Sequence, residues 1–374
     1  MDVQIIAAII TAAATIFAVF ISHWLVVSRK VAPPERIEAP TGAPKEKTAE
    51  SIDRDFIVGV ALSLALAVIF GLSHVLGKYI VTTSTENPLL VITGRNVISG
   101  LFILIFALVI RHLKQEQVIK HTYTKDSAFM VLGRSASSIF YFLTFLYLTA
   151  TATITLYKLN TIFTFILLMF LVTQALSRIS MANILIGIVV GIAGSVVTVG
   201  GFGESLNGEI QTSSVGVSFA LLAGIFWSVY IVFSERYSAN NPQYNSLSSR
   251  QSYVGRIYLL SSIPLILLLA VAPFTMPEQY STMNISLEGL FGVVALGCIS
   301  GVIGILYFEA LKRISSLLVG VIVSLEIFFT MVFENIFLGQ NITWNLFVGA
   351  LLVIVASISV GRESKKLKLR KSSA

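Results

Sequence analysis

Two charged residues, Lys158 and Glu326, lie deep inside long apolar stretches of the chain. Lys158 is about 9 Å into one apolar segment and Glu326 is about 15 Å into another, at a helical rise of about 1.5 Å per residue. A charge at such a depth in a membrane is costly and needs an opposite charge, a proton or a charged ligand. We therefore interpret both residues as candidates for substrate binding or ion coupling. A structural ion pair between them is the alternative, and a substrate that breaks this pair would unite the two interpretations.

A polar face on the segment that holds Lys158 adds neutral candidates. Four of its residues recur at i, i+4, i+7 and i+11, a spacing that places them on one side of a helix. They are Thr153, Tyr157, Asn160 and Thr164, and Lys158 and Thr161 border them. Because polar side chains are costly against lipid, we expect this face to line a cavity. Tyr157, Asn160 and Thr161 are therefore candidate binding residues.

Four further residues inside apolar segments have both a functional and a structural interpretation. Arg95 and Arg134 lie several residues inside their segments, and we interpret them as packing or gating residues rather than direct ligands. His74 either faces the cavity or forms an interior hydrogen bond. Tyr230 either packs in the interior or stacks on a ligand.

Charged residues near the ends of apolar segments are expected to have structural roles. Lys78 and Glu334 lie near the ends predicted to be extracytoplasmic, and Glu309 lies near a cytoplasmic end. A long charged side chain at such a place can keep its stem in apolar surroundings and extend its head group to the interface. We expect these three residues to anchor their helices.

The composition excludes a soluble protein. Hydrophobic residues make up 55% of the 374 residues, charged residues make up 12%, and the mean hydropathy is +0.86. Soluble domains carry about 25% charged residues. A single cysteine, Cys298, excludes an internal disulfide framework. The net charge of +7 does not indicate nucleic-acid binding, because the basic residues are distributed over loops that face lipid head groups.

The distribution of lysine and arginine predicts the orientation of the chain in the membrane. Of the 26 Lys and Arg residues, four lie inside apolar segments, and the other 22 all fall on one side of a single topology. The loops assigned to the opposite side contain none. Because basic residues are concentrated in cytoplasmic loops, we expect a multi-pass cell-membrane protein with an extracytoplasmic N-terminus and a cytoplasmic C-terminus.

Apolar runs of about 20 residues predict eleven membrane helices. One is an additional N-terminal helix within residues 1–27, and residues 28–54 form a Pro-rich, charged linker that we expect to be disordered in the cytoplasm. A basic cytoplasmic tail, 362–374, ends the chain. Ten core helices are expected at about 56–82, 88–110, 126–149, 152–174, 182–202, 213–234, 252–275, 287–310, 316–337 and 343–361.

The core contains an internal repeat. LNTIFT at 159–164 corresponds to LEIFFT at 325–330, and the following helices begin with Asn183-x-x-x-Gly187 and Asn345-x-x-x-Gly349. The repeat divides the core into two halves of five helices, 55–202 and 203–361. Because five is odd, the second half must enter the membrane from the opposite face. The prediction is an all-α membrane protein, a ten-helix bundle of two inverted five-helix repeats, with a binding site between the halves.

The core of the chain, at about 55–361, resembles the EamA-like family of the drug/metabolite transporter superfamily. The resemblance is carried by FEALKRISSLLVGVIVSLEIFFTMVFENIFLGQNITWNLFVGALLVI at 308–354, by AVIFGLSHVLGKYIV at 67–81 and by PLLVITGRNVISG at 88–100, where Arg95 stands as it often does in that family. LLAGIFWSVYIVFSERY at 221–237 also fits. The chain departs from the family where Asn160 and Glu326 replace mid-helix prolines. The resemblance implies a metabolite transporter.

The expected function is a secondary-active transporter that moves small polar metabolites, such as amino acids, by alternating access. The alternative within this class is an antiporter of anionic metabolites such as nucleotide sugars or sugar phosphates, because intramembrane cations outnumber the one carboxylate at the membrane midplane. The expected partners are a small-molecule substrate and the lipid bilayer, without nucleic acid. The glycines of GIVVGIAG, 187–194, allow close helix packing within the chain or, as an alternative, in a homodimer.

An intramembrane enzyme and a channel are the alternatives from other classes. Gly133-x-Ser135 and His74 could in principle form a catalytic serine–histidine dyad. However, no nearby sequence resembles a turn that would form an oxyanion hole. The sequence lacks a metal-binding motif and a filter-like loop. We therefore expect no catalytic residues, no metal site and no cofactor.

Overall fold

The computed structural model describes residues 49–82, 87–115, 123–171, 181–198, 214–240, 246–275, 285–314 and 316–368. All regular secondary structure in these ranges is helical, which confirms the all-α prediction. The helices are α2 (Ala49–Thr82), α3 (Pro88–Lys114), α4 (Lys125–Thr144), α5 (Ala150–Tyr157), α6 (Asn160–Leu171), α7 (Met181–Thr198), α8 (Ser214–Asn240), α9 (Leu247–Thr275), α11 (Leu287–Arg313), α12 (Ser316–Val323), α13 (Glu326–Leu338) and α14 (Trp344–Lys368).

The predicted N-terminal helix and basic tail fall largely outside the described residues. The predicted linker overlaps the structure only at its end, where α2 already begins at Ala49. Ala49 and the residues after it, with sequence AESIDRD, include good helix formers, so the helix begins about two turns before the apolar run. The charged residues in this first part of α2 lower its hydropathy, so the apolar run alone does not predict that this part is helical.

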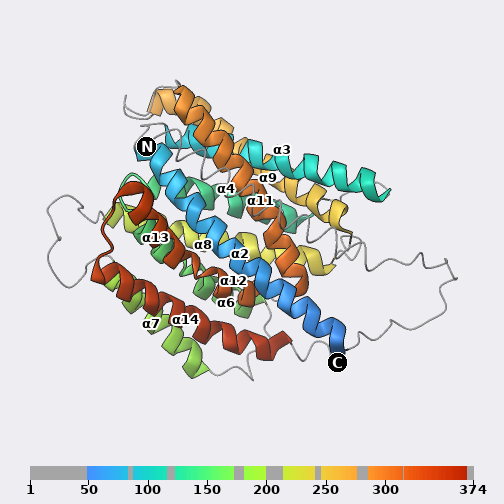
Figure 1. Cartoon of the computed structure of the whole chain (residues 1–374), viewed down its shortest axis with the longest axis vertical. Coiled ribbons are helices and arrows are strands. Elements are labelled where there is room, and N and C mark those ends of the chain that lie inside the picture. The colour runs from blue at the N-terminus through green and yellow to red at the C-terminus, as the bar shows by residue number, and fades with distance from the viewer. Residues whose placement is uncertain are drawn as a thin grey trace.

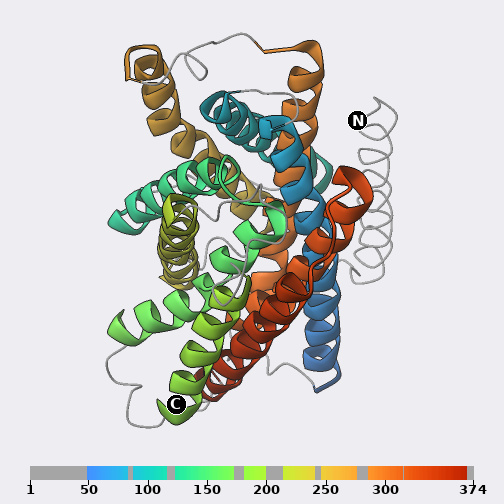
Figure 2. The ribbon, with the colours of Figure 1, turned by 90° about the vertical axis from the view of Figure 1, so that its left-hand side faces the viewer.

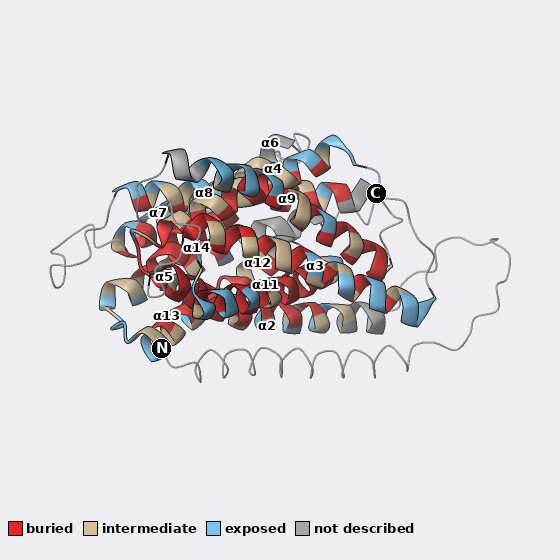
Figure 3. Ribbon diagram, turned by 90° about the horizontal axis from the view of Figure 1, so that it is seen from above, coloured by how far each residue is buried: buried red, intermediate tan, exposed pale blue. Residues whose placement is uncertain are grey.

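The long apolar helices confirm a multi-pass membrane protein. Seven described helical segments are long and apolar enough to cross a bilayer, and two of them, Ala150–Leu167 and Leu318–Leu338, each consist of two shorter helices. The apolar helices Leu185–Thr198 and Trp344–Ser359 are shorter. Helix α4 is absent from both groups, because serines and Arg134 lower its hydropathy. Many large apolar side chains are exposed. Figure 3 shows the exposed residues toward the outside of the bundle and the buried residues in its interior. Exposed apolar surface of this extent fits a lipid environment.

Two helices that the sequence predicts as continuous are broken. The predicted helix at 152–174 is divided into α5 and α6 by a turn at Lys158–Leu159, and the predicted helix at 316–337 is divided into α12 and α13 by a turn at Ser324–Leu325. The amide of Leu159 bonds to the carbonyl three residues back at 3.2 Å, and that of Leu325 does the same at 3.1 Å. Each of these hydrogen bonds spans three residues instead of the four of an α-helix, so the chain is wound more tightly there and the α-helix is interrupted.

Helix packing accounts for the first break. A Cβ atom at Gly224 of α8 would lie 3.0 Å from the carbonyl oxygen of Tyr157, so α8 approaches the backbone at the break closely. The hydroxyl of Ser228 on α8 donates to the carbonyl of Asn160 at 2.8 Å. A neighbouring helix therefore packs directly against the backbone on both sides of the break.

The helix contacts follow a consistent pattern. Helix α2 packs against α11 and both parts of the α12–α13 pair, and α8 packs against α4 and both parts of the α5–α6 pair. Helix α3 packs on α9, and α7 packs on α14. Figure 1 shows α7 and α14 side by side at one edge of the bundle and α3 with α9 at the opposite edge. In Figure 2 the blue α2 runs beside the red segments that include α13.

The glycine-rich stretch of α7 packs within the chain. A Cβ atom at Gly194 would lie 2.8 Å from Leu352 Cβ and 2.9 Å from the carbonyl oxygen of Gly349 on α14. Only a small residue allows this approach, so Gly194 and Gly349 bring two helices into backbone contact. Of the two roles predicted for this stretch, packing within the chain and packing in a homodimer, the structure shows packing within the chain for Gly194.

Candidate functional site

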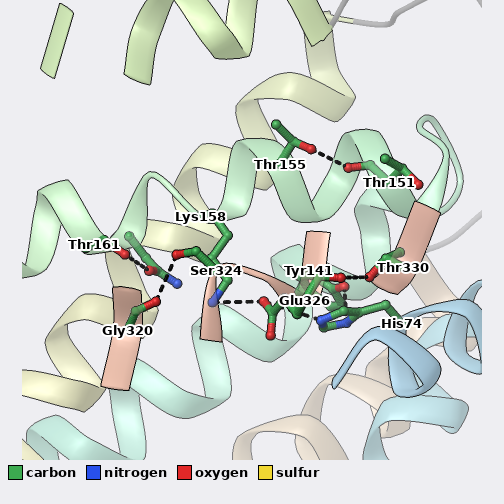
Figure 4. A network of polar contacts seen from close by, with 11 residues as sticks. His74, Tyr141, Thr151, Thr155, Lys158, Thr161, Gly320, Ser324, Glu326 and Thr330 are labelled. Carbon is green, nitrogen blue, oxygen red and sulfur yellow. Dashed lines mark hydrogen bonds and ion pairs between the residues drawn. The ribbon is translucent and has the colours of Figure 1, made fainter. Parts of the chain in front are cut away.

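Lys158 and Glu326 form a buried ion pair where the two broken helices meet. Lys158 Nζ lies 2.9 Å from Glu326 Oε1, and the side chains are 6% and 1% exposed, so the predicted contact is present (Figure 4). Lys158 follows the last residue of α5, whose carbonyl end is electronegative, and Glu326 is the first residue of α13, whose amide end is electropositive. Each half-helix therefore favours the charge it carries, beyond the attraction between the charges.

His74 and Tyr141 extend this pair toward other helices. His74 Nε2 on α2 lies 3.6 Å from Glu326 Oε1, longer than an ordinary hydrogen bond, and Tyr141 Oη on α4 lies 2.6 Å from His74 Nδ1. A neutral His74 with its hydrogen on Nε2 would accept the Tyr141 hydroxyl hydrogen and direct its N–H at Glu326. Glu326 Oε2 has no hydrogen-bond partner. The carboxylate thus retains capacity for a further donor or a proton.

A pocket lies beside this network. It is lined by Phe70, Ser73, His74, Arg95, Ser137, Ser138, Tyr141, Phe142, Tyr157, Trp227, Ser300 and Ile303. Of the predicted site residues, His74, Arg95 and Tyr157 line it. Lys158 and Glu326 do not, and His74 connects them to it, since that residue both lines the pocket and lies within 3.6 Å of Glu326. The expectation that the polar face of α5 and α6 lines a cavity holds for Tyr157.

Arg95 lies at this pocket without an acidic partner. Its guanidinium carbon lies 5.2 Å from the centre of the Phe142 ring. Its Nε is buried and has no hydrogen-bond partner, and no salt bridge joins Arg95 to an acidic group in the described part of the chain. Arg95 therefore lies where the functional interpretation among its two requires, on the wall of the pocket.

Arg134 and Tyr230 belong to a separate packed cluster. The guanidinium carbon of Arg134, which is 1% exposed, lies 3.2 Å from the ring centre of Tyr258 and 5.7 Å from that of Tyr230. Its Nη2 donates to Asn96 Oδ1 at 3.5 Å. Aromatic faces attract a guanidinium and shield it from lipid, so both residues take the packing role among their two interpretations.

Asn160 and Thr161 lie at the start of α6, on the far side of the break from Tyr157. Thr161 Oγ1 donates to Asn160 Oδ1 at 3.3 Å, and Asn160 Nδ2 has no partner. Asn160 occupies the repeat position that corresponds to Glu326, since both are the first residues of the second half-helix. The structure places Asn160 and Thr161 beside the break rather than on the pocket wall.

Tyr141 is the site residue that the sequence analysis did not include among the candidates. Arg134, Ser138 and Tyr141 recur at i, i+4 and i+7 on α4, a spacing that would have placed Tyr141 on the polar face of that helix. The pattern is visible in the sequence, but its partner His74 is 67 residues away. Only the packing of α2 on α4 brings the hydroxyl and the imidazole together.

Glu334 and Lys78 bind backbone groups instead of reaching an interface. The Glu334 carboxylate accepts from the amides of Ala150 at 2.7 Å and Thr151 at 2.9 Å, at the N-terminus of α5. Lys78 donates to the carbonyl oxygens of Phe145 and Leu148. Their structural roles agree with expectation, but the mechanism differs, because both side chains find partners inside the bundle.

The comparisons with known proteins agree with the resemblance seen in the sequence. The model of the EamA-like transporter family matches residues 214–362, from α8 into α14, and confirms the resemblance over the second half of the core. A search of curated proteins gives no match. The chain is similar to a solved structure described only as "Crystal structure of protein", with a TM-score of 0.55 and 17% sequence identity. The similarity covers 82% of this chain and 98% of that chain and shows a common fold.

Proposed function

We propose that this protein is a secondary-active transporter that moves small polar metabolites, amino acids or related compounds, by alternating access. The family match and the apolar helices support a membrane transporter of the drug/metabolite type. The observation that carries the finer proposal is the buried pair Lys158–Glu326, which joins the broken helix of one half to that of the other. Transporters characteristically bind substrate and coupling ions where helices are interrupted near the midplane.

Two structural parallels support an arrangement of two inverted repeats. The two breaks fall at corresponding positions, before Asn160 in LNTIFT and before Glu326 in LEIFFT. The contacts of α2 with α11, α12 and α13 correspond to those of α8 with α4, α5 and α6. In this proposal, rocking of one half against the other exposes the site to each side in turn.

The ion pair serves as the coupling element of the proposed cycle. Lys158 and Glu326 come from different halves, so a relative movement of the halves must strain or break their contact. Each charge is costly when left alone in a low dielectric, and a substrate group or a proton can compensate for the separation. His74 provides the route by which an event in the pocket reaches Glu326.

The test is counterflow in proteoliposomes that contain the purified full chain. We expect saturable uptake of a labelled small polar metabolite that is accelerated by unlabelled substrate inside the vesicles. Glu326→Gln and Lys158→Met should each reduce this exchange at least about tenfold, since a misplaced coupling group of this kind costs a few kcal/mol. Flux that never saturates and shows no counterflow would indicate a channel.

Arg236→Gln is the matched control for loss of charge. Arg236 forms an ion pair with Asp126 at 3.5 Å, but its side chain is 53% exposed. An exposed pair contributes little to stability, so this variant should exchange substrate at the wild-type rate. Wild-type exchange in Glu326→Gln and Lys158→Met as well would contradict a role for the buried pair.

An antiporter of anionic metabolites such as nucleotide sugars or sugar phosphates is the second candidate. The observation in its favour is Arg95, a cation at the pocket that has no acidic partner among the described residues. A thermal-shift screen of the purified protein against amino acids, nucleotide sugars, phosphorylated sugars and polyamines distinguishes the two, because a ligand that binds the folded state raises its melting temperature.

A further inference from the structure

We infer that Arg95 and the serines of the pocket form a subsite for the carboxylate of a ligand that carries one negative charge there. This inference deepens the proposed transport function and rests on it. The subsite differs from the Lys158–Glu326 pair, which the proposal uses for coupling, in that its residues face the pocket directly.

The first argument is the state of the arginine charge. Other buried cations of the described bundle have compensating groups: Lys158 is 2.9 Å from Glu326, Arg250 is 2.9 Å from Glu309, and Arg134 lies against an aromatic face at 3.2 Å. Among the described residues, Arg95 has the Phe142 ring at 5.2 Å and no ion pair. Its buried Nε has no acceptor; the same holds for the Nε atoms of Arg134 and Arg250, but these two guanidinium groups have the compensating groups named above. A buried guanidinium N–H without an acceptor is costly, and an anion in the pocket would remove that cost.

The second argument is the set of hydroxyl groups around the same pocket. Ser73 of α2, Ser137 and Ser138 of α4, and Ser300 of α11 line it together with Arg95 of α3. Serine hydroxyls can donate to a carboxylate while the guanidinium supplies a charge-assisted hydrogen bond. Groups from four helices that can donate hydrogen bonds therefore line the same pocket.

The third argument is the number of charges. Lys158 is occupied by Glu326, and Arg134 is enclosed by Tyr258 and Tyr230, so Arg95 is the arginine or lysine that lines the pocket within the described ranges. One uncompensated cation matches one negative charge. A sugar phosphate or nucleotide sugar brings about two negative charges near neutral pH, and the second would lack a partner. The charge balance favours a carboxylate.

The remaining pocket wall indicates the body of the ligand. Phe70, Phe142, Tyr157 and Trp227 line the pocket, so a large part of its surface is aromatic. Apolar walls with a few placed polar groups are usual for small-molecule sites, where the polar groups fix orientation. A small carboxylate with an apolar body satisfies the guanidinium at one end and the aromatic wall at the other.

Trp227 provides a local reporter for the test. The chain has three tryptophans, and Trp24→Phe with Trp344→Phe leaves Trp227 as the single emitter in the full-length protein. Emission is titrated with 4-methylpentanoate and with its uncharged counterpart 4-methylpentanamide. Leucine, leucinamide and glucose 1-phosphate extend the series. We expect saturable changes with 4-methylpentanoate and leucine and none with the two amides.

Substitutions assign the response to the guanidinium. In the same background, Arg95→Gln should weaken 4-methylpentanoate binding about 10- to 100-fold, the loss expected for a charge-assisted hydrogen bond. Arg95→Lys keeps the charge but loses the planar guanidinium, so it should bind with intermediate affinity. This intermediate affinity would show that the loss in Arg95→Gln comes from the missing charge and not from misfolding. Arg111→Gln, near the end of the same helix and off the pocket, should bind as the parent does.

Several results would overturn the subsite. They are equal binding of the acid and its amide, unchanged affinity in Arg95→Gln, tighter binding of glucose 1-phosphate than of the carboxylates, or no response to any of these probes. Counterflow measured on the same proteins distinguishes failure of the subsite from failure of the transport proposal. Saturable exchange of a neutral or cationic compound that survives Arg95→Gln keeps the transporter and removes the subsite. Lack of exchange with every compound removes the transporter, while the Trp227 titration still decides the subsite.

Discussion

At the scale of single residues, the site depends on how charges are compensated inside the membrane. Lys158 and Glu326 neutralise each other at 2.9 Å, and both also lie at the favourable ends of half-helices. Removing one member of a buried pair typically costs about 3–5 kcal/mol, because the other charge remains without a partner. The pair is therefore sensitive to any change that alters only one side.

A double-mutant cycle tests the energetic coupling of this pair. Glu326→Gln and Lys158→Met should each destabilise the protein, and the double variant should be less destabilised than the sum of the two, with a coupling energy of about 1–3 kcal/mol. The measurement is the free energy of unfolding in detergent by denaturant titration. Strictly additive effects would show that the two residues do not stabilise each other.

A second residue-scale prediction concerns a coupling proton on Glu326. If the proposed cycle uses the unpartnered Glu326 Oε2 as the proton site, Glu326→Gln should abolish uptake driven by a pH gradient while substrate exchange at equal pH persists at a reduced rate. Both activities are measured in the same proteoliposomes. Retention of pH-driven uptake by the glutamine variant would locate the coupling proton elsewhere or exclude one.

At the scale of elements, the short helix α5 is held at both ends by side chains from the other half. Glu334 of α13 binds the free amides of Ala150 and Thr151 at its beginning, and Glu326 binds Lys158 at its end. An eight-residue helix has little stability of its own, so these contacts supply what length does not. The two halves of the core are thus joined at two places along one short element.

Loss of the Glu334 cap should loosen the start of α5. We expect Glu334→Ala to lower the free energy of unfolding by about 1.5–3 kcal/mol, the range for hydrogen bonds to a charged group, and to increase hydrogen exchange at Ala150 and Thr151. Thermal denaturation and exchange followed by mass spectrometry measure the two effects. Asn335→Ala is the control on the neighbouring exposed residue, and equal behaviour of both variants would contradict the capping role.

At the scale of the whole molecule, lysine and arginine distribution predicts how the bundle lies in the membrane. All basic residues outside the apolar segments fall on one predicted side, which places Met1 outside and Ala374 in the cytoplasm. The described helices agree with repeated membrane crossings. The two termini then lie on opposite sides, as an odd number of spans requires.

Cysteine labelling tests this orientation. With Cys298 replaced by serine, a single cysteine introduced beside Glu204 should react with an impermeant reagent added from outside, whereas one introduced beside Lys371 should react only after the membrane is opened. The expected difference is complete, because the positive-inside rule makes the two loops face opposite compartments. If the cysteine beside Glu204 reacted only with reagent on the cytoplasmic side, the protein would have the opposite orientation.

A truncation tests whether the N-terminal segment takes part in transport. The ten predicted core helices lie outside this segment, and α2 begins at Ala49, so deletion of residues 1–48 should leave an inserted protein with measurable counterflow. The amount of inserted protein is quantified alongside flux. A truncated protein that inserts at the wild-type level and has no flux would reveal a functional part of this segment.

The sequence by itself determined the membrane class, the places of the described core helices and the two residues of the ion pair. Apolar runs and charge distribution are local properties, so α3 begins at Pro88 and α11 at Leu287 near where hydropathy places them. Lys158 and Glu326 could be matched because the predicted repeat makes their two helices equivalent, with Lys158 close to the position that corresponds to Glu326. Their identity as a candidate pair required no contact information.

The tertiary structure alone decided the helix breaks, the capping of α5 and the residues that share the pocket. The first break is stabilised by Gly224 and Ser228 of another helix, and the cap on α5 comes from Glu334, which is 184 residues from Ala150 in the chain. The position of Arg95 on the pocket wall was also decided by how distant helices pack. Periodicity gives the face of one helix, but the partner of that face depends on how distant helices pack.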